Sequence, residues 1–249
     1  GDDGFFESTE DTFYGYDLGL EMAGGAAVLW DTRQFIHLPS TPTVRGTRQP
    51  LPRETGEFLL GTPYAKQTWA DGLDENGRPI LIPNMEPSPE GTVVSPAITG
   101  GSNWWSPSYS PRTDLLYVMA YDAETRYFIR KTTYEEGDSF RAGGGLSPQP
   151  AESYHRAIRA ISPQTGARRW EFTVDSRTTS GLLSTAGDVL FSGTADGFFF
   201  ALDANTGEEL WHKNIGGRVH AGPMTYAVGG RQYVAIAAGN AVFSFALPE

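Results

Sequence analysis

The carboxylates between residues 71 and 90 form the densest group of side chains that could do acid–base or calcium chemistry. They are Asp71, Asp74, Glu75, Glu86 and Glu90. Paired carboxylates can transfer protons, and carboxylate oxygens suit calcium. Their spacing matches no calcium-binding loop, however, and the Asp-Glu-Asn-Gly stretch at 74–77 is typical of a tight turn. A solvated loop is therefore favoured over a metal or acid–base site.

Histidine, serine and cysteine give no clearer catalytic pattern. The four histidines are His37, His155, His212 and His220, and the closest two are 220 − 212 = 8 positions apart. That spacing forms no metal-binding pair, so each is interpreted as a single surface or edge histidine. Ser184 and Ser192 lack the glycine-flanked context of a nucleophile elbow. The absence of cysteine excludes a disulfide framework, a thiolate nucleophile and a cysteine-type zinc site.

Two adjacent tryptophans stand out in the stretch GGSNWWSPSYSP at 100–111. Turn-forming residues precede them and a proline-rich stretch follows, so the pair is expected to start or end a strand and not to lie in a helix. Successive side chains of a strand point to opposite faces. One indole, that of Trp105, is expected to pack in the core, while Trp104 faces elsewhere beside Asn103.

The composition restricts the class of protein. The chain has 249 residues and a formal net charge of 19 − 30 = −11. An acidic surface argues against nucleic acid as a partner, because phosphate binding needs a basic patch. An aromatic content of 12% suits half-buried β-strands. The sequence contains no apolar run long enough to span a bilayer, and its first residues lack the basic start and apolar core of a signal peptide.

An internal repeat gives the strongest indication of fold. Residues 160–170 read AISPQTGARRW, residues 201–211 read ALDANTGEELW, and their terminal tryptophans are 211 − 170 = 41 positions apart. Weaker echoes occur at 51–60 and at 108–118, where Asp114 replaces the glycine. A repeat of about 40 residues that contains short strands is typical of β-propeller blades, each a four-stranded antiparallel meander. The terminal Trp of each motif is expected to lie over the neighbouring blade.

The strand pattern predicts an all-β fold. Three strands at 188–194, 197–203 and 208–214 follow an apolar stretch at 181–185, which makes one complete blade. The end of the chain supplies three further strands, so about four blades are expected, the last one incomplete. Residues 61–98 and 121–155 are interpreted as loop-rich excursions on one face. We expect residues 1–50 to be an irregular leader and residues 51–249 to contain the blades.

These segments together resemble the alcohol dehydrogenases that depend on pyrroloquinoline quinone (PQQ), an eight-bladed quinoprotein propeller family. The resemblance rests on residues 55–80, 100–111, 181–211 and 233–248 and on the Ala-x-Asp-x-x-Thr-Gly-x-x-x-Trp motif. It covers roughly residues 55–249 and corresponds to the C-terminal half of the family. The catalytic Asp, the metal ligands, the adjacent-cysteine disulfide and the Trp beneath the quinone belong to family segments that find no matching position in this chain.

The resemblance implies a cofactor site but no complete catalytic centre. Asn103 and Trp104 match the Asn-Trp that lies near PQQ in the family, where amide donors and aromatic surface suit a planar anion. The alternative interpretation is a turn asparagine and a core tryptophan. No residue is assigned as catalytic or metal-binding. Calcium or a lanthanide is the metal of the full-length family, and its ligands are not expected here.

The function implied is PQQ-dependent oxidation of an alcohol or aldose, with hydride transfer to the quinone and an electron acceptor as partner. Periplasmic location follows from the same resemblance. We expect the isolated chain to be inactive, and we expect self-association through open blade edges. The alternative is a non-enzymatic propeller that acts as a binding or envelope-assembly scaffold.

Overall fold

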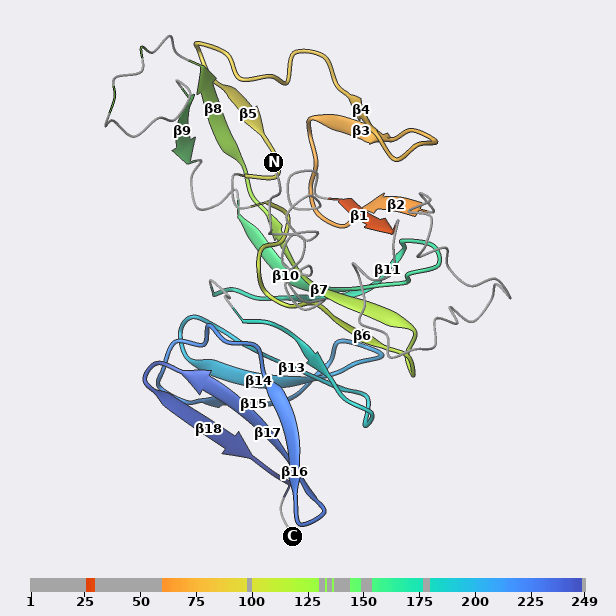
Figure 1. Ribbon diagram of the computed structural model, residues 1–249, viewed down its shortest axis with the longest axis vertical. Helices are drawn as coiled ribbons and strands as arrows, with labels where there is room; N and C mark the ends of the chain where they lie inside the picture. Colours follow the sequence, from red (N-terminus) through yellow and green to blue (C-terminus); the bar gives the residue numbers. More distant parts are fainter. Residues whose placement is uncertain are drawn as a thin grey trace.

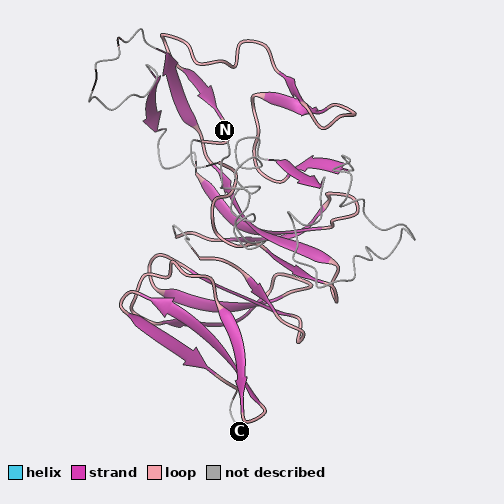
Figure 2. Cartoon of the chain, in the orientation of Figure 1, coloured by secondary structure: helices cyan, strands magenta, loops and turns pink. Residues whose placement is uncertain are grey.

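The protein is described by a computed structural model over residues 26–29, 60–97, 100–129, 133, 136, 144–148, 154–176 and 180–247. Strands joined by turns and loops make up this part of the chain (Figure 2). Within it, no helix has the length and apolar character needed to cross a membrane. The all-β class expected from the sequence is confirmed. The expected leader lies outside the described residues, apart from strand β1 (Ala26–Leu29).

The central sheet is antiparallel and has the strand order β11-β10-β7-β6. Its strands are β6 (Ser108–Ser110), β7 (Leu115–Asp122), β10 (His155–Ile161) and β11 (Arg168–Thr173). Strand β7 is buried along Leu115–Tyr121, as its unbroken run of apolar residues requires. Asp114 takes a positive φ of 56° in the hairpin turn between β6 and β7.

The second sheet is the four-stranded meander that the sequence predicts. Its order is β12-β13-β14-β15, with β12 at Leu183–Ser184, β13 at Val189–Gly193, β14 at Phe198–Asp203 and β15 at Glu209–Asn214. The hairpin turn before β14 needs Gly197 at φ 94°, and the turn before β15 needs Gly207 at φ 76°.

The terminal sheet has three strands, as expected. Strands β16 (Met224–Val228), β17 (Arg231–Ala238) and β18 (Ala241–Phe245) pair in that order. Figure 1 shows this sheet beside the second sheet at the lower end of the molecule, with the C-terminus beyond it. Phe199 of β14 and Phe245 of β18 contact each other with ring centroids 5.4 Å apart.

The two excursions contain short strands. Strand β3 (Ala70–Leu73) forms a hairpin with β4 (Pro79–Leu81), and β2 (Leu60–Pro63) pairs with β1. Strands β5 (Thr92–Val94), β8 (Thr125–Ile129) and β9 (Gly144–Pro148) form a separate sheet. The prediction of a loop-rich stretch at 121–155 therefore needs correction, because TRYFI at 125–129 is rich in β-branched and aromatic residues and forms β8, which pairs with β5 on one side and with β9 on the other.

The sequence repeat corresponds to the outer hairpins of two successive sheets. Ala160 pairs with Trp170 in one hairpin and Ala201 pairs with Trp211 in the other, and both ladders shift register directly after the alanine. The echo at 108–118 belongs instead to the inner hairpin β6–β7. A positive-φ residue closes either hairpin, which explains why the two segments look alike in sequence.

The central sheet contacts different neighbours through its two faces. Side chains of β7 alternate, so that Tyr117 and Met119 belong to the core shared with the second sheet, whereas Val118 and Ala120 pack with Tyr64 and Ala65. The core shared with the second sheet also holds aliphatic and aromatic residues of β13 and β14. Successive residues of β7 therefore contact different neighbours on the two faces of the sheet.

Candidate functional site

The predicted cofactor residues lie in a bend at 100–105, directly before strand β6. Asn103 is partly buried, the indole of Trp104 is 57% exposed, and that of Trp105 is only 8% exposed. The two indoles are therefore separated into an outer and an inner one, as the sequence predicts. The bend itself differs from the expected strand end, because the inner strand begins only at Ser108.

Backbone hydrogen bonds hold this bend against both large sheets. The Tyr121 amide donates to the carbonyl of Gly101 at 2.7 Å, which ties the bend to the end of β7. The Leu182 amide donates to the carbonyl of Ser106 at 2.9 Å, which ties the following residues to the second sheet. The indole of Trp105 belongs to the core between the two sheets, and its expected packing between blades is confirmed.

Two donors in the bend lack a hydrogen-bond partner within the described part of the chain. They are the hydroxyl of Ser102, in a residue 1% exposed, and the indole Nε1 of Trp105. Asn103 uses its Oδ1 to accept a hydrogen bond from the Trp104 amide at 2.9 Å. Unsatisfied buried donors are costly and indicate a water or ligand.

The carboxylates between residues 71 and 90 do not form a site. Asp71, Glu75, Glu86 and Glu90 are exposed, and Asp74 accepts hydrogen bonds from the Asn76 and Arg78 amides, which lower the pKa of its carboxyl. A group of three or more potential metal-binding side chains is not found among the described residues.

The histidines and serines considered from the sequence also lie apart from one another. His155 pairs with Glu171 and His212 with Glu209, whereas His37 lies outside the described residues. Ser192 is fully buried and donates to the carbonyl of Gly181, and Ser184 contacts Ser108 on the neighbouring inner strand. None of these contacts brings a nucleophile to a base.

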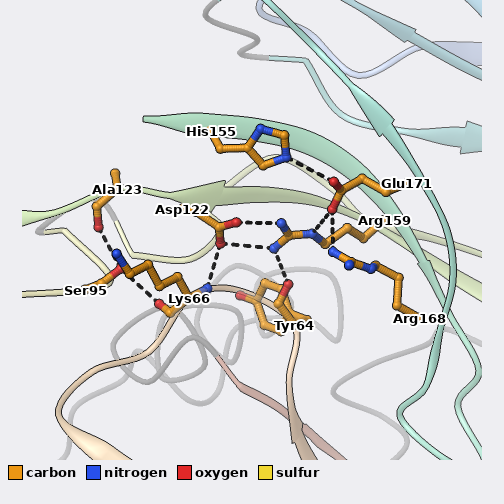
Figure 3. A network of polar contacts seen from close by, with 9 residues as sticks. All are labelled: Tyr64, Lys66, Ser95, Asp122, Ala123, His155, Arg159, Arg168 and Glu171. Atoms are coloured by element: carbon orange, nitrogen blue, oxygen red, sulfur yellow. Dashed lines mark hydrogen bonds and ion pairs between the residues drawn. The ribbon is translucent and has the colours of Figure 1, made fainter. Parts of the chain in front are cut away.

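Sequence reasoning missed a buried ionic network on the other face of the central sheet. Arg159 is 4% exposed, and its guanidinium lies between the carboxylates of Asp122 and Glu171 (Figure 3). It donates to Asp122 at 2.6 and 3.1 Å, to Glu171 at 2.6 Å and to the carbonyl of Tyr64 at 2.5 Å. The available signal was an arginine on a strand that also carries Ala157, Ile158, Ala160 and Ile161, since buried charges require partners.

The network fixes the chain that precedes β3. Asp122 accepts a further hydrogen bond from the Lys66 amide at 2.6 Å, and the Ser95 hydroxyl bridges the carbonyls of Lys66 and Ala123 (Figure 3). Burial alone would raise the pKa of Asp122, but hydrogen bonds from Arg159 and Lys66 outweigh burial and lower it. The pKa of Glu171 is likewise lowered, because Arg159 and His155 outweigh its burial.

A shallow cleft of about 460 Å³ lies over this network, between β2 and the β10–β11 hairpin. Lys66 and Arg168 stand at its sides, and Arg159 and Asp122 contribute to its lining. Because the nearby cations Lys66 and Arg168 are themselves paired with Glu124 and Glu171, the cleft has no unbalanced charge for a ligand. The network therefore holds the segment at Tyr64 and Lys66 against the central sheet.

The chain is similar to known proteins in sequence. Residues 171–234 match the family model of the glucose/ethanol/alcohol dehydrogenase β-propeller domain. The quinoprotein alcohol dehydrogenase PedH of Pseudomonas putida is 34% identical over 198 residues, which are 76% of this chain and 33% of PedH. A 1-butanol dehydrogenase (cytochrome c) of Thauera butanivorans is 36% identical over 200 residues, which are 76% of this chain and 29% of that protein.

The chain is also similar in structure to solved dehydrogenases. The quinohemoprotein alcohol dehydrogenase of Comamonas testosteroni superposes with a TM-score of 0.70 at 30% identity, covering 75% of this chain and 29% of that one. A europium-containing methanol dehydrogenase superposes with a TM-score of 0.67 at 29% identity, covering 74% of this chain and 33% of that one. The chain thus spans about a third of the length of the proteins it matches.

Proposed function

We propose, on the premise that this chain is related to the C-terminal part of quinoprotein alcohol dehydrogenases, that it forms one wall of a PQQ site in an enzyme oxidising an alcohol or aldose. One observation carries the proposal. The 100–105 bend presents the exposed indole of Trp104 beside Asn103, and two buried donors there lack a partner among the described residues.

The residues of the bend would bind and orient the cofactor. PQQ supplies the hydride acceptor for alcohol oxidation when it is bound. The indole of Trp104 offers a flat apolar surface for a planar ring system, and the Asn103 amide group can donate to an oxygen at its edge. Trp105 is held by the core, so the bend is fixed before a ligand binds, which reduces the entropy lost on binding.

The catalytic base and the metal ligands are expected to come from parts of the enzyme that this chain does not match. A metal ion in such a site would supply Lewis-acid chemistry at the quinone. The described residues hold no cluster that would bind it. We therefore infer that the chain alone binds the quinone but does not oxidise alcohols. We also propose a periplasmic location and a one-electron carrier, such as a cytochrome c, as acceptor.

Titration with PQQ tests the proposal through quenching of tryptophan fluorescence. Wild type is expected to bind at micromolar quinone. Trp104→Phe should lose most of the quenching, and Asn103→Ala should weaken binding by up to about tenfold through one lost hydrogen bond. Trp211→Phe, at another exposed tryptophan, is the matched control and should bind normally.

Two outcomes would count against the proposal. Wild type that shows no quenching would favour the scaffold alternative, which the named relatives do not support. Reduction of an artificial acceptor by the chain with PQQ and calcium or a lanthanide would refute the inference that it is inactive alone.

Self-association is proposed for the open edge of the terminal sheet. Strand β18 is paired on one side in the described structure, and Val242 on it is 75% exposed. Exposed edges of this kind pair with other chains. A clean, concentration-independent monomer in size-exclusion chromatography would contradict this.

A further inference from the structure

Trp104 contacts the end of a column of side chains that lies along one face of the central sheet. Its ring centroid lies 5.7 Å from that of Trp105, and Trp105 stacks on Tyr121 at 5.0 Å with an interplanar angle of 17°. The guanidinium of Arg156 lies 5.5 Å from the centre of the Tyr121 ring and 5.3 Å from that of Tyr154. The column therefore connects the exposed indole to β7 and β10.

The strand register places this column on one face. Arg156 and Tyr121 are directly paired on β10 and β7, so their side chains stand on the same side of the sheet. Both Trp105 and Tyr121 are 8% exposed, and they form part of the core shared with the second sheet. Trp104 is 57% exposed, and its indole contacts that of Trp105. Its tilt consequently depends on the ring beneath it.

Among the described residues, Arg156 contacts aromatic rings and forms no ion pair. Its Nε is buried without a hydrogen-bond partner among the described residues, in contrast to Arg159 on the same strand. A guanidinium between two aromatic rings is attracted by the negative faces of both. We expect such a cation to favour one orientation of the Tyr121 ring, which is the plane on which Trp105 stacks.

We propose that Arg156 is a positioning residue, which acts through Tyr121 and Trp105 to set the orientation of Trp104 at the surface. Its relevance to cofactor binding rests on the proposed PQQ site, since Trp104 is the indole assigned there. The geometry of the column itself does not depend on that proposal. Replacing Arg156 should therefore change the angle between the two indoles even when no quinone is present.

Circular dichroism is sensitive to this angle. Two indoles in contact give an exciton couplet whose amplitude depends on their mutual orientation, and Trp104–Trp105 is the indole pair in contact in the described structure. Trp104→Phe and Trp105→Phe, made in the full chain, should each abolish the couplet and so assign it. Arg156→Met should lose most of the amplitude, and Arg156→Lys should restore part of it because it retains the cation. Arg169→Met, at an exposed arginine of β11, should leave the couplet unchanged.

The quinone titration gives a second readout. Arg156→Met should weaken PQQ binding by only about threefold to fivefold, since the two cation–π contacts that it removes act on the quinone through Trp104 alone. If wild type does not bind PQQ, the proposed function fails, whereas the couplet still decides the role of Arg156. If Arg156→Met does not keep the strand signal of wild type, Arg156→Gln replaces it, with the same loss expected. An unchanged couplet in a folded Arg156 variant that lacks the cation overturns the proposal.

Discussion

The two faces of the central sheet contact their neighbours through different kinds of interaction. Toward the second sheet, Tyr117, Trp170 and Phe172 pack against apolar residues. The Tyr117 hydroxyl and the Trp170 indole both donate to the carbonyl of Ala204, at 2.9 and 3.1 Å. Trp170 also covers Gly207, where an added Cβ would lie 2.6 Å from the ring. This face combines a large apolar core with a few neutral hydrogen bonds and the cation–π contact of Arg156 with Tyr121.

Toward the β2–β3 segment, the same sheet uses charges. Arg159 joins Asp122 and Glu171, and the network reaches the backbone of Tyr64 and Lys66. A buried ion network is costly when one partner is removed, because the remaining charge stays buried without compensation. The comparison indicates that the charged face fixes the position of one segment, while the aromatic face supplies most of the burial between sheets.

The largest effect is expected from breaking the charged face. Arg159→Met removes the shared partner of two carboxylates and should reduce the free energy of unfolding by about 3–5 kcal/mol. Arg168→Met is the matched control on the same network. Because the Arg168 side chain is 55% exposed, its loss should cost under about 1 kcal/mol. Urea denaturation at pH 7 measures both, and equal losses would show that Arg159 is no more than a surface ion pair.

The aromatic face is tested by filling the space that Trp170 occupies. Gly207→Val places a branched side chain against the ring and at a φ of 76°, so overpacking and strain should together cost about 3 kcal/mol. Gly216 has a φ of 75°, but an added Cβ there meets nothing within 4 Å. Gly216→Val should therefore cost only the backbone strain, about 1–2 kcal/mol. Equal destabilisation in the two variants would mean that Trp170 does not restrict Gly207.

The aromatic face could be predicted from the sequence because it repeats. The motif at 160–170 and 201–211 gave the outer hairpins, and the terminal Trp of the first motif does lie over the next sheet. Trp105 was likewise predicted as the inner indole from strand alternation. Local turn chemistry and periodic tryptophans are properties of short stretches, so a single sequence contains them.

The charged face could not be predicted in the same way. Asp122 and Arg159 are 37 positions apart, and Tyr64 is 95 positions from Arg159. Their meeting depends on the register of β7 with β10 and on the path of the excursion, neither of which any short stretch specifies. The Arg156 column has the same origin, since only the pairing of Tyr121 with Arg156 places the cation over the ring.

The smallest effect is expected from titrating the charged face. The ordinary pKa values of Asp122 and Glu171 are 3.8 and 4.5, and both are lowered in the folded protein. Their ionised forms therefore stabilise the fold above these values, and this stability is lost as the pH falls through the lowered ones. Both side chains keep some contact with water, which limits the loss below that of Arg159→Met.

Asp74, Asp188 and Asp196 also have lowered pKa values, so wild type alone cannot assign the acid sensitivity. Asp122→Asn removes one charge of the network and keeps the shape of the side chain. Its free energy of unfolding should fall less steeply than that of wild type between about pH 5 and pH 3. Identical slopes in urea denaturation across this range would mean that the Asp122–Arg159 contact does not favour the ionised carboxylate, and the contrast between the two faces would then rest on geometry alone.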